Sequence, residues 1–302
     1  MEQQRSSWLS LDDNLIELKK LILMYRREHV LVAYGQELGY HHGAKFQILS
    51  AWENWYSKND VSVCVVTDKP ELFEGYPIRL LPITVKDVHE WSLEGLQHFG
   101  IKLKAFEYSM KTSTAPISVL LDTDTYWIKN PDPLLDNICE NSAIMFCDEG
   151  LVSRTRNVSI NRFNEALSKR VIKWGKEEYQ ISPKSRMLNS SIIGLHKSNA
   201  QLLEQAFELF RALEPIVDAH TVEQFAVAEI FRLKGIELTF GSKYTRDWSS
   251  IGRKNYATPL LKNFFYRYGE NDFNNHLKFV RSIPIRRPLA TFLKQKISKA
   301  WK

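Results

Sequence analysis

The stretch that decides the fold is ISVLLDTDTYW, residues 117–127. Residues 117–121 form a mostly apolar run with two β-branched side chains, which is typical of a strand buried on both faces of a sheet. The run ends in Asp122, Thr123 and Asp124, so it delivers two carboxylates to the carboxyl end of the strand, where open α/β sheets bind ligands. If extended geometry persists, both carboxylates face the same side. Such oxygen ligands suit Mg²⁺ or Mn²⁺.

Other segments surround this strand with the pattern of an α/β protein. Helical spacing of apolar residues predicts helices over 40–56, within 91–111 and from Ser198 onward. We expect residues 150–186, which are polar and basic, to be rich in loops. Six further segments read as strands: 29–35, 61–67, 78–83, 143–147, 187–195 and 236–240. The β-α-β-β order of the first elements predicts a parallel sheet with right-handed crossovers.

The composition describes a globular chain of 302 residues with 44% hydrophobic residues. No Gly-rich phosphate loop follows the first strand, which argues against a kinase or a dinucleotide enzyme. The three cysteines show no metal-type pairing and fit a reducing compartment. The N-terminus lacks the apolar core of a signal peptide, and no segment approaches the roughly 20 apolar residues of a membrane span. We therefore expect a soluble, cytoplasmic protein.

Both ends of the chain carry features of their own. Residues 11–27 have the pattern of a short amphipathic helix, which we expect to form an N-terminal cap over residues 1–28. Residues 278–302 hold eight basic side chains and no acid, and without them the chain has 33 basic and 35 acidic residues. From Leu289 the tail has the spacing of a basic amphipathic helix. Such helices bind anionic membrane surfaces, at about 1 kcal/mol per basic residue. We expect this of residues 283–302; no motif indicates nucleic acid.

The order of these motifs resembles the glycosyltransferases of GT-A fold, in which an Asp-x-Asp sequence holds a divalent ion on the diphosphate of a nucleotide-sugar. Two later stretches add to the resemblance. MLNSSIIGL (residues 187–195) is similar to the Asn-(Ser/Thr)-Gly strand of that family, although Ser191 stands where Gly is common. Glu223 and Gln224 stand where that family often has Asp-Gln or Glu-Asp at the start of a helix on the acceptor side, with Glu in place of Asp. The resemblance covers residues 29–280 and implies one Rossmann-type α/β domain, with a mixed, mostly parallel sheet flanked by helices and a basic helical tail at residues 281–302.

The resemblance also assigns roles to individual residues. It implies a metal shell of Asp122, Asp124 and His276, the last after the aromatic segment 265–269. The positions that match donor-binding residues are Tyr34, Asp68, Lys102, Lys104, Asp122 and Thr123. Those that match acceptor-binding residues are Asn189 and Ser190. The candidate catalytic residues are Glu223, Gln224 and Asp148, and the Glu223-Gln224 pair favours retention of configuration over inversion.

Several of these residues also fit purely structural roles. Asp68 precedes Pro70 and suits a turn, while Lys102 and Lys104 suit a solvated helix face. Thr221 and Gln224 have the spacing of a capping box at a helix start. A lone histidine such as His276 is commonly a surface residue.

Three functions remain open at this point. The sequence predicts a metal-dependent enzyme of bacterial polysaccharide type that moves a sugar from a nucleotide-sugar, preferably a UDP-sugar, to a glycan or lipid-linked glycan at the inner face of the cytoplasmic membrane. The stretch LLDTDT (residues 120–125) also resembles the first motif of haloacid-dehalogenase-type phosphatases, with Asp122 as nucleophile and Asp124 as acid/base. The downstream Gly-Asp-x-x-x-Asp motif of that class is absent. An inactive transferase that serves as a scaffold or glycan-binding subunit is the third possibility.

Overall fold

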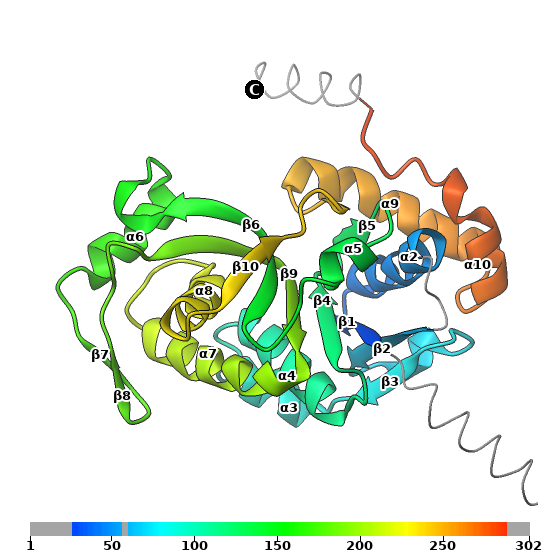
Figure 1. The fold of residues 1–302 in the computed structure, drawn as a ribbon. Coiled ribbons are helices and arrows are strands. Elements are labelled where there is room, and N and C mark those ends of the chain that lie inside the picture. Colours follow the sequence, from blue (N-terminus) through cyan, green and yellow to red (C-terminus); the bar gives the residue numbers. More distant parts are fainter. Residues whose placement is uncertain (1–25, 56–59, 289–302) are drawn as a thin grey trace, which may run out of the picture.

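The computed structural model describes residues 26–55 and 60–288 (Figure 1). The tail helix predicted from Leu289 lies outside the described residues, as do residues 11–25 of the predicted N-terminal helix. That helix is predicted to extend to residue 27, but Arg27 begins the first strand of the sheet. The division of the chain into a cap, a central domain and a tail therefore stays a prediction.

One seven-stranded sheet organises the described chain, with the strand order β10-β6-β9-β4-β1-β2-β3. Its strands are β1 (Arg27–Ala33), β2 (Val61–Thr67), β3 (Arg79–Pro82), β4 (Ile117–Leu121), β6 (Ser142–Leu151), β9 (Arg186–His196) and β10 (Glu237–Phe240). Strand β9 runs antiparallel to both of its neighbours, β4 and β6, whereas the other neighbouring pairs are parallel. The sheet is therefore mixed and mostly parallel, as the sequence predicts, and every segment predicted as a strand forms one of its strands.

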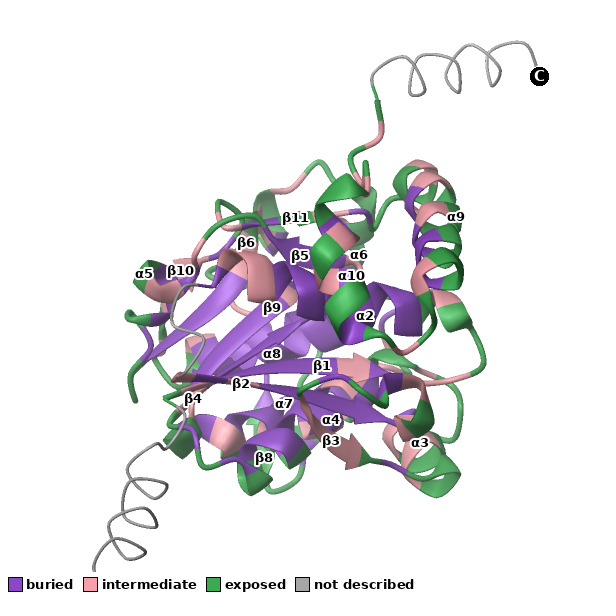
Figure 2. Cartoon of the chain, turned by 90° about the vertical axis from the view of Figure 1, so that its right-hand side faces the viewer, coloured by how far each residue is buried: buried purple, intermediate pink, exposed green. Residues whose placement is uncertain are grey.

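Helices cover both faces of this sheet (Figure 1). One core lies beneath α4 (Phe99–Thr112), α7 (Ala200–Leu213) and α8 (Val222–Leu233), with α3 (Val85–Trp91) beside them. A second core lies against α2 (Leu38–Asn54), α9 (Ile251–Tyr268) and α10 (Phe273–Phe279). Figure 2 shows the central strands buried, while the outer faces of α9 and α10 stay exposed. None of the helices in the described ranges has the length and apolarity needed to cross a bilayer.

Two local predictions are wrong in detail. The segment 150–186 contains helix α6 (Val158–Leu167) and a hairpin of β7 (Ile172–Trp174) and β8 (Glu177–Tyr179). The helix buries Ile160, Phe163 and Leu167, whose spacing forms one apolar face among polar residues. Helix α7 begins at Ala200, because residues 197–199 form a short 3₁₀ turn.

Two small strands complete the region after the Asp-x-Asp sequence. Strand β5 (Thr125–Trp127) pairs antiparallel with β11 (Thr245–Asp247). A short helix, α5 (Asp132–Leu135), follows β5. The β5–β11 pair therefore joins the end of β4 to the start of α9.

Candidate active site

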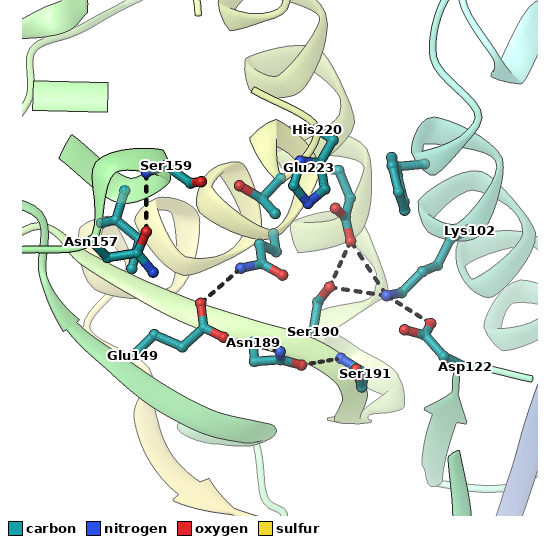
Figure 3. Close-up of a pocket in the computed structure, with 14 residues that line it drawn as sticks. Lys102, Asp122, Glu149, Asn157, Ser159, Asn189, Ser190, Ser191, His220 and Glu223 are labelled. Carbon is teal, nitrogen blue, oxygen red and sulfur yellow. Dashed lines mark hydrogen bonds and ion pairs between the residues drawn. The ribbon is translucent and has the colours of Figure 1, made fainter. Parts of the chain in front are cut away.

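A cavity of about 340 Å³ lies between α4, the end of β4, the outer halves of β6 and β9, and the start of α8 (Figure 3). Polar side chains predominate in its wall. The lining residues are Phe99, Lys102, Asp122, Glu149, Asn157, Ser159, Ile160, Asn189, Ser190, Ser191, His220, Thr221, Glu223 and Gln224. The structure thus brings together Lys102, Asp122, Asn189, Ser190, Glu223 and Gln224 from the predicted site.

Lys102 is the centre of the charged part of this cavity. Its Nζ lies 2.8 Å from Asp122 Oδ1 and 3.3 Å from Glu223 Oε1, and it donates a hydrogen bond to Ser190 Oγ. Ser190 Oγ in turn donates to Glu223 Oε1 over 2.6 Å. Burial disfavours the charged form of Lys102, but the two carboxylates outweigh this effect and raise its pKa. The side chain is therefore an ammonium shared between Asp122 and Glu223.

A second polar group surrounds Glu149. Asn189 Nδ2 donates to Glu149 Oε1 over 3.1 Å, and Gln224 Nε2 donates to Glu149 Oε2 over 3.3 Å. Asn189 Oδ1 also accepts a hydrogen bond from the backbone N–H of Ser191. Two neutral amides therefore orient one exposed carboxylate at the cavity wall.

Asp148, the predicted alternative catalytic carboxylate, does not line the cavity. It forms an ion pair of 2.6 Å with Arg186 and accepts from the backbone N–H of Gly150. Successive side chains of a strand point to opposite faces, so only one of Asp148 and Glu149 can face the site. The pairing of β6 with β9 shifts register between Asp148 and Gly150, and Glu149 lines the cavity.

Lys104, the second predicted donor lysine, also lies outside the cavity. It pairs with Glu107 over 2.6 Å and covers the ring of Phe207. Helix residues two positions apart do not share a face. Only Lys102 of the two can reach the site.

The two aspartates of the Asp-x-Asp sequence diverge, contrary to the prediction that they face the same side. Extended geometry ends at Asp122, because the backbone N–H of Thr125 donates to the carbonyl oxygen of Asp122 and closes a turn. Asp122 therefore meets Lys102 on α4, whereas Asp124 forms an ion pair of 3.1 Å with Lys254 on α9. Burial, followed by the negative charge of Asp122, raises the pKa of Asp124.

Helix α2 holds this turn from behind. Gln47 Nε2 donates to the carbonyl oxygens of Asp122 and Thr125, over 3.0 and 2.5 Å. One helical turn earlier, Gly43 lies so close that an added Cβ would be 2.4 Å from the carbonyl oxygen of Thr123. Glycine is therefore required at position 43 for the helix to contact the turn.

Tyr34 and Asp68 lie at the carboxyl ends of β1 and β2, as predicted, but they do not line the cavity. Asp68 accepts hydrogen bonds from the backbone N–H of Gly35, and Tyr34 Oη donates to the carbonyl oxygen of His98 over 3.2 Å. Burial raises the pKa of the Tyr34 phenol, and Asp122 contributes to the shift. Their donor-binding role stays a prediction.

The structure does not bring His276 to the two aspartates. The residue is fully buried on α10, where Nδ1 lies 2.6 Å from Tyr76 Oη and Nε2 contacts the carbonyl oxygen of Gly269. The rings of Phe264 and Phe265 pack against it. Both ring nitrogens are engaged in this aromatic core, so His276 is not available as the predicted third metal ligand.

Asp122 and Asp124 are the residues that could hold a metal. Across residues 26–55 and 60–288, no group of three or more His, Cys, Asp or Glu side chains is placed to bind an ion. Mg²⁺ is commonly bound through one or two carboxylates together with substrate phosphates and water. The charge repulsion between Asp122 and Asp124 would be relieved by a shared cation. The pair therefore fits an ion that is completed by a phosphate-bearing substrate.

Sequence reasoning missed several residues of the site: Glu149, Asn157, Ser159, His220 and Lys254. The sequence indicated Glu149 only through its position beside Asp148 at the end of a predicted strand. The pairing of β6 with β9 shows that Glu149, and not Asp148, faces the cavity. Asn157 caps α6 by accepting from the backbone N–H of Ser159, a pattern that the sequence does contain. Nothing local in the sequence connects Lys254 with Asp124.

No protein-family model matches the chain, and no curated protein sequence matches it. Among solved structures, the chain is similar to galactosyltransferase LgtC in complex with donor and acceptor sugar analogues, with 9% identity over 87% of this chain and 98% of that one and a TM-score of 0.49. It is also similar to mouse xyloside xylosyltransferase 1, with 10% identity over 71% and 84% of the two chains and a TM-score of 0.45.

A third similar structure is the bifunctional glycosyltransferase WbbM, with 14% identity and a TM-score of 0.44. This chain covers 38% of WbbM, and 72% of this chain is aligned. These structural neighbours are GT-A glycosyltransferases, the family that the sequence resembles. The likeness concerns the fold.

Proposed function

We propose that this protein is a glycosyltransferase that moves a sugar from a nucleotide-sugar to a hydroxyl group of an acceptor. The observation that carries the proposal is the meeting of Asp122, Lys102 and Glu223 in one cavity at the carboxyl end of β4. Open α/β sheets bind ligands at this edge. The cavity offers carboxylates, amides and hydroxyls, which are the groups that hydrogen-bond to sugar hydroxyls.

The donor's leaving group would lie beside Asp122 and Asp124. A divalent cation, Mn²⁺ or Mg²⁺, held by these two residues would supply charge neutralisation for the departing nucleoside diphosphate. Lys102 and Lys254 already hold the two carboxylates in place from opposite sides. The two lysines also add positive charge beside the departing diphosphate, and this charge would stabilise the negative charge that develops on it.

Glu223 is the candidate catalytic carboxylate on the side of the transferred sugar. Its side chain is 2% exposed, and Lys102 and Ser190 fix its orientation. A fixed, buried carboxylate stabilises the positive charge that develops at the sugar's anomeric carbon. This role fits retention of configuration, which the sequence resemblance favours.

Glu149 is the candidate base for the acceptor hydroxyl. Its partners are the neutral amides of Asn189 and Gln224, and within the described residues no cation pairs with it. Proton removal from a hydroxyl by a positioned carboxylate is general base catalysis. This role fits inversion, so Glu149→Gln and Glu223→Gln separate the two stereochemical outcomes.

The donor and acceptor classes are proposed from the sequence resemblance and from the basic tail. The proposed donor is a UDP-sugar, and the proposed acceptor is a glycan or lipid-linked glycan at the inner face of the cytoplasmic membrane. Residues 283–302 would bring the protein to the anionic surface. Deletion of this segment should abolish binding to anionic liposomes, and unchanged binding would contradict the membrane proposal.

The experiment that tests the function is thermal unfolding against a panel of nucleotides and nucleotide-sugars, with and without Mn²⁺. A ligand at 100 times its dissociation constant should add about 2.7 kcal/mol to the free energy of unfolding. The proposal expects a Mn²⁺-dependent increase with a nucleotide-sugar that is absent in Asp124→Ala. No increase with any nucleotide would contradict it, and turnover of phosphate monoesters with Mg²⁺ would instead support the phosphatase.

A further inference from the structure

A second cavity, of about 480 Å³, lies beside the β5–β11 pair and the first turns of α9, where residues 285–287 pass over them. It shares no lining residue with the cavity of Asp122 and Glu223. Its lining residues are Tyr126, Arg246, Asp247, Trp248, Arg253, Ile285, Arg286 and Arg287.

The charge of this lining is one-sided. Four arginines and a single carboxylate, Asp247, line the cavity. Asp247 is already engaged, because it lies 3.1 Å from Arg253 Nη1 and accepts a hydrogen bond from Ser249 Oγ. Within the described part of the chain, neither Arg246 nor Arg286 forms an ion pair with a carboxylate.

The arginines come from three separate parts of the chain: strand β11, helix α9 and the segment 286–287. Like charges gathered in this way repel one another unless an anion lies between them. The buried residues Trp248 and Tyr126, which are 5% and 8% exposed, increase this repulsion because they exclude water from one side of the cavity. The cavity therefore has the electrostatics of an anion site.

We propose that this cavity binds a phosphate group. Guanidinium groups bind phosphate oxygens through paired hydrogen bonds, and several of them around one centre suit a group with several charged oxygens better than they suit a carboxylate. Two sources supply this chemistry: a small soluble phosphate compound, or the headgroup phosphate of a lipid. None of the lining residues is one that we propose for sugar transfer, and the site is tested without a donor sugar.

The test measures binding to the full chain by titration calorimetry, without divalent metal or nucleotide. One arm uses inorganic phosphate, and the other uses phosphatidylglycerol vesicles against phosphatidylcholine vesicles. The double variant Arg246→Gln with Arg286→Gln should weaken binding about tenfold or more, because two charge-assisted hydrogen-bonding groups are lost. The matched control, Arg154→Gln with Arg170→Gln, removes the same charge from exposed positions outside both cavities and should bind as the wild type does.

Loss of inorganic phosphate binding in the Arg246 and Arg286 variant supports a soluble phosphate ligand, and loss of phosphatidylglycerol binding alone supports a lipid headgroup. The proposal is overturned if the wild type binds neither, or if the control variant loses binding to the same extent. If the glutamine pair does not fold, the charge-retaining pair Arg246→Lys with Arg286→Lys is compared with the wild type. It should bind phosphate more weakly, because lysine lacks the paired hydrogen bonds of a guanidinium group.

Discussion

At the scale of single residues, the site depends on one lysine between two acids. Lys102 is 12% exposed and Glu223 is 2% exposed, so their pairing lies almost out of reach of solvent. Removal of one partner of a buried ion pair leaves an uncompensated charge, which costs about 3–5 kcal/mol. We expect Lys102→Met to lower the free energy of unfolding by about this amount in urea titrations.

The matched control for this variant is Lys104→Met, two positions along the same helix. Lys104 is 25% exposed, and its partner Glu107 keeps a second lysine, Lys111. We expect a loss of about 1 kcal/mol or less. Equal losses in the two variants would contradict the central role of Lys102.

The same residues show where sequence reasoning reaches its limit. The family resemblance and helix spacing were enough to propose Lys102, Asp122 and Glu223, which the structure brings together. The choice between Asp148 and Glu149 required the register of β6, which a shift in pairing determines. The burial of His276 depends on an aromatic core assembled from segments nearly 200 residues apart, which no local pattern reveals.

At the scale of elements, helix α2 positions the Asp-x-Asp turn. An alanine at position 43 would place its Cβ 2.4 Å from the carbonyl oxygen of Thr123, so either the helix or the turn must move. We expect Gly43→Ala to weaken Mn²⁺-dependent nucleotide binding at least about tenfold, since a 1.4 kcal/mol displacement cost already has this effect. The measurement is calorimetric titration of the nucleotide.

Gly39→Ala on the same helix is the control. Its added Cβ would meet only the methyl group of Thr258 at 3.3 Å, and that side chain can adjust. Nucleotide binding should stay as in the wild type. If Gly39→Ala and Gly43→Ala weaken nucleotide binding to the same extent, the close contact between α2 and the Asp-x-Asp turn is not the cause of the loss.

Strands and helices could be predicted where a pattern within a few consecutive residues determines them. Each strand of the main sheet appears in the sequence as an apolar run between turn residues, and all of them form. The divergence of Asp122 and Asp124 was not predictable, because a single hydrogen bond from Thr125 ends the strand geometry between them. Helix α6 was overlooked because polar residues surround its apolar face.

At the scale of the whole molecule, buried histidines make stability depend on pH. His29 lies in β1 between Trp55 and Trp127, and neither of its ring nitrogens has a hydrogen-bond partner among residues 26–55 and 60–288. Burial lowers its pKa to about 3. Burial also lowers the pKa values of His41, His42 and His276. In the unfolded chain these groups titrate near 6.5.

The sign of the effect follows from proton binding. Between pH 6.5 and pH 3 the unfolded chain binds a proton at His29 that the folded protein does not, so stability is lost as the pH falls, by up to about 1.4 kcal/mol per pH unit. We expect His29→Phe to flatten this dependence in urea titrations from pH 7 to pH 4. The exposed control His89→Phe should keep the wild-type slope, and an unchanged slope in His29→Phe would contradict the assignment.

The most direct test of the account is the release of nucleoside diphosphate from UDP- and GDP-sugars in the presence of Mn²⁺ and added glycan acceptors, with the sugar passing to an acceptor hydroxyl or, more slowly, to water. Mass spectrometry follows both products. The wild type should release the diphosphate, and Glu223→Gln should lower the rate about 10²-fold or more, as the loss of a fixed transition-state contact does. Asp148→Asn, which changes a carboxylate outside the cavity, should keep the wild-type rate. Release that is unaffected by Glu223→Gln, or no release from any nucleotide-sugar, would contradict a glycosyl-transfer site at Asp122, Lys102 and Glu223.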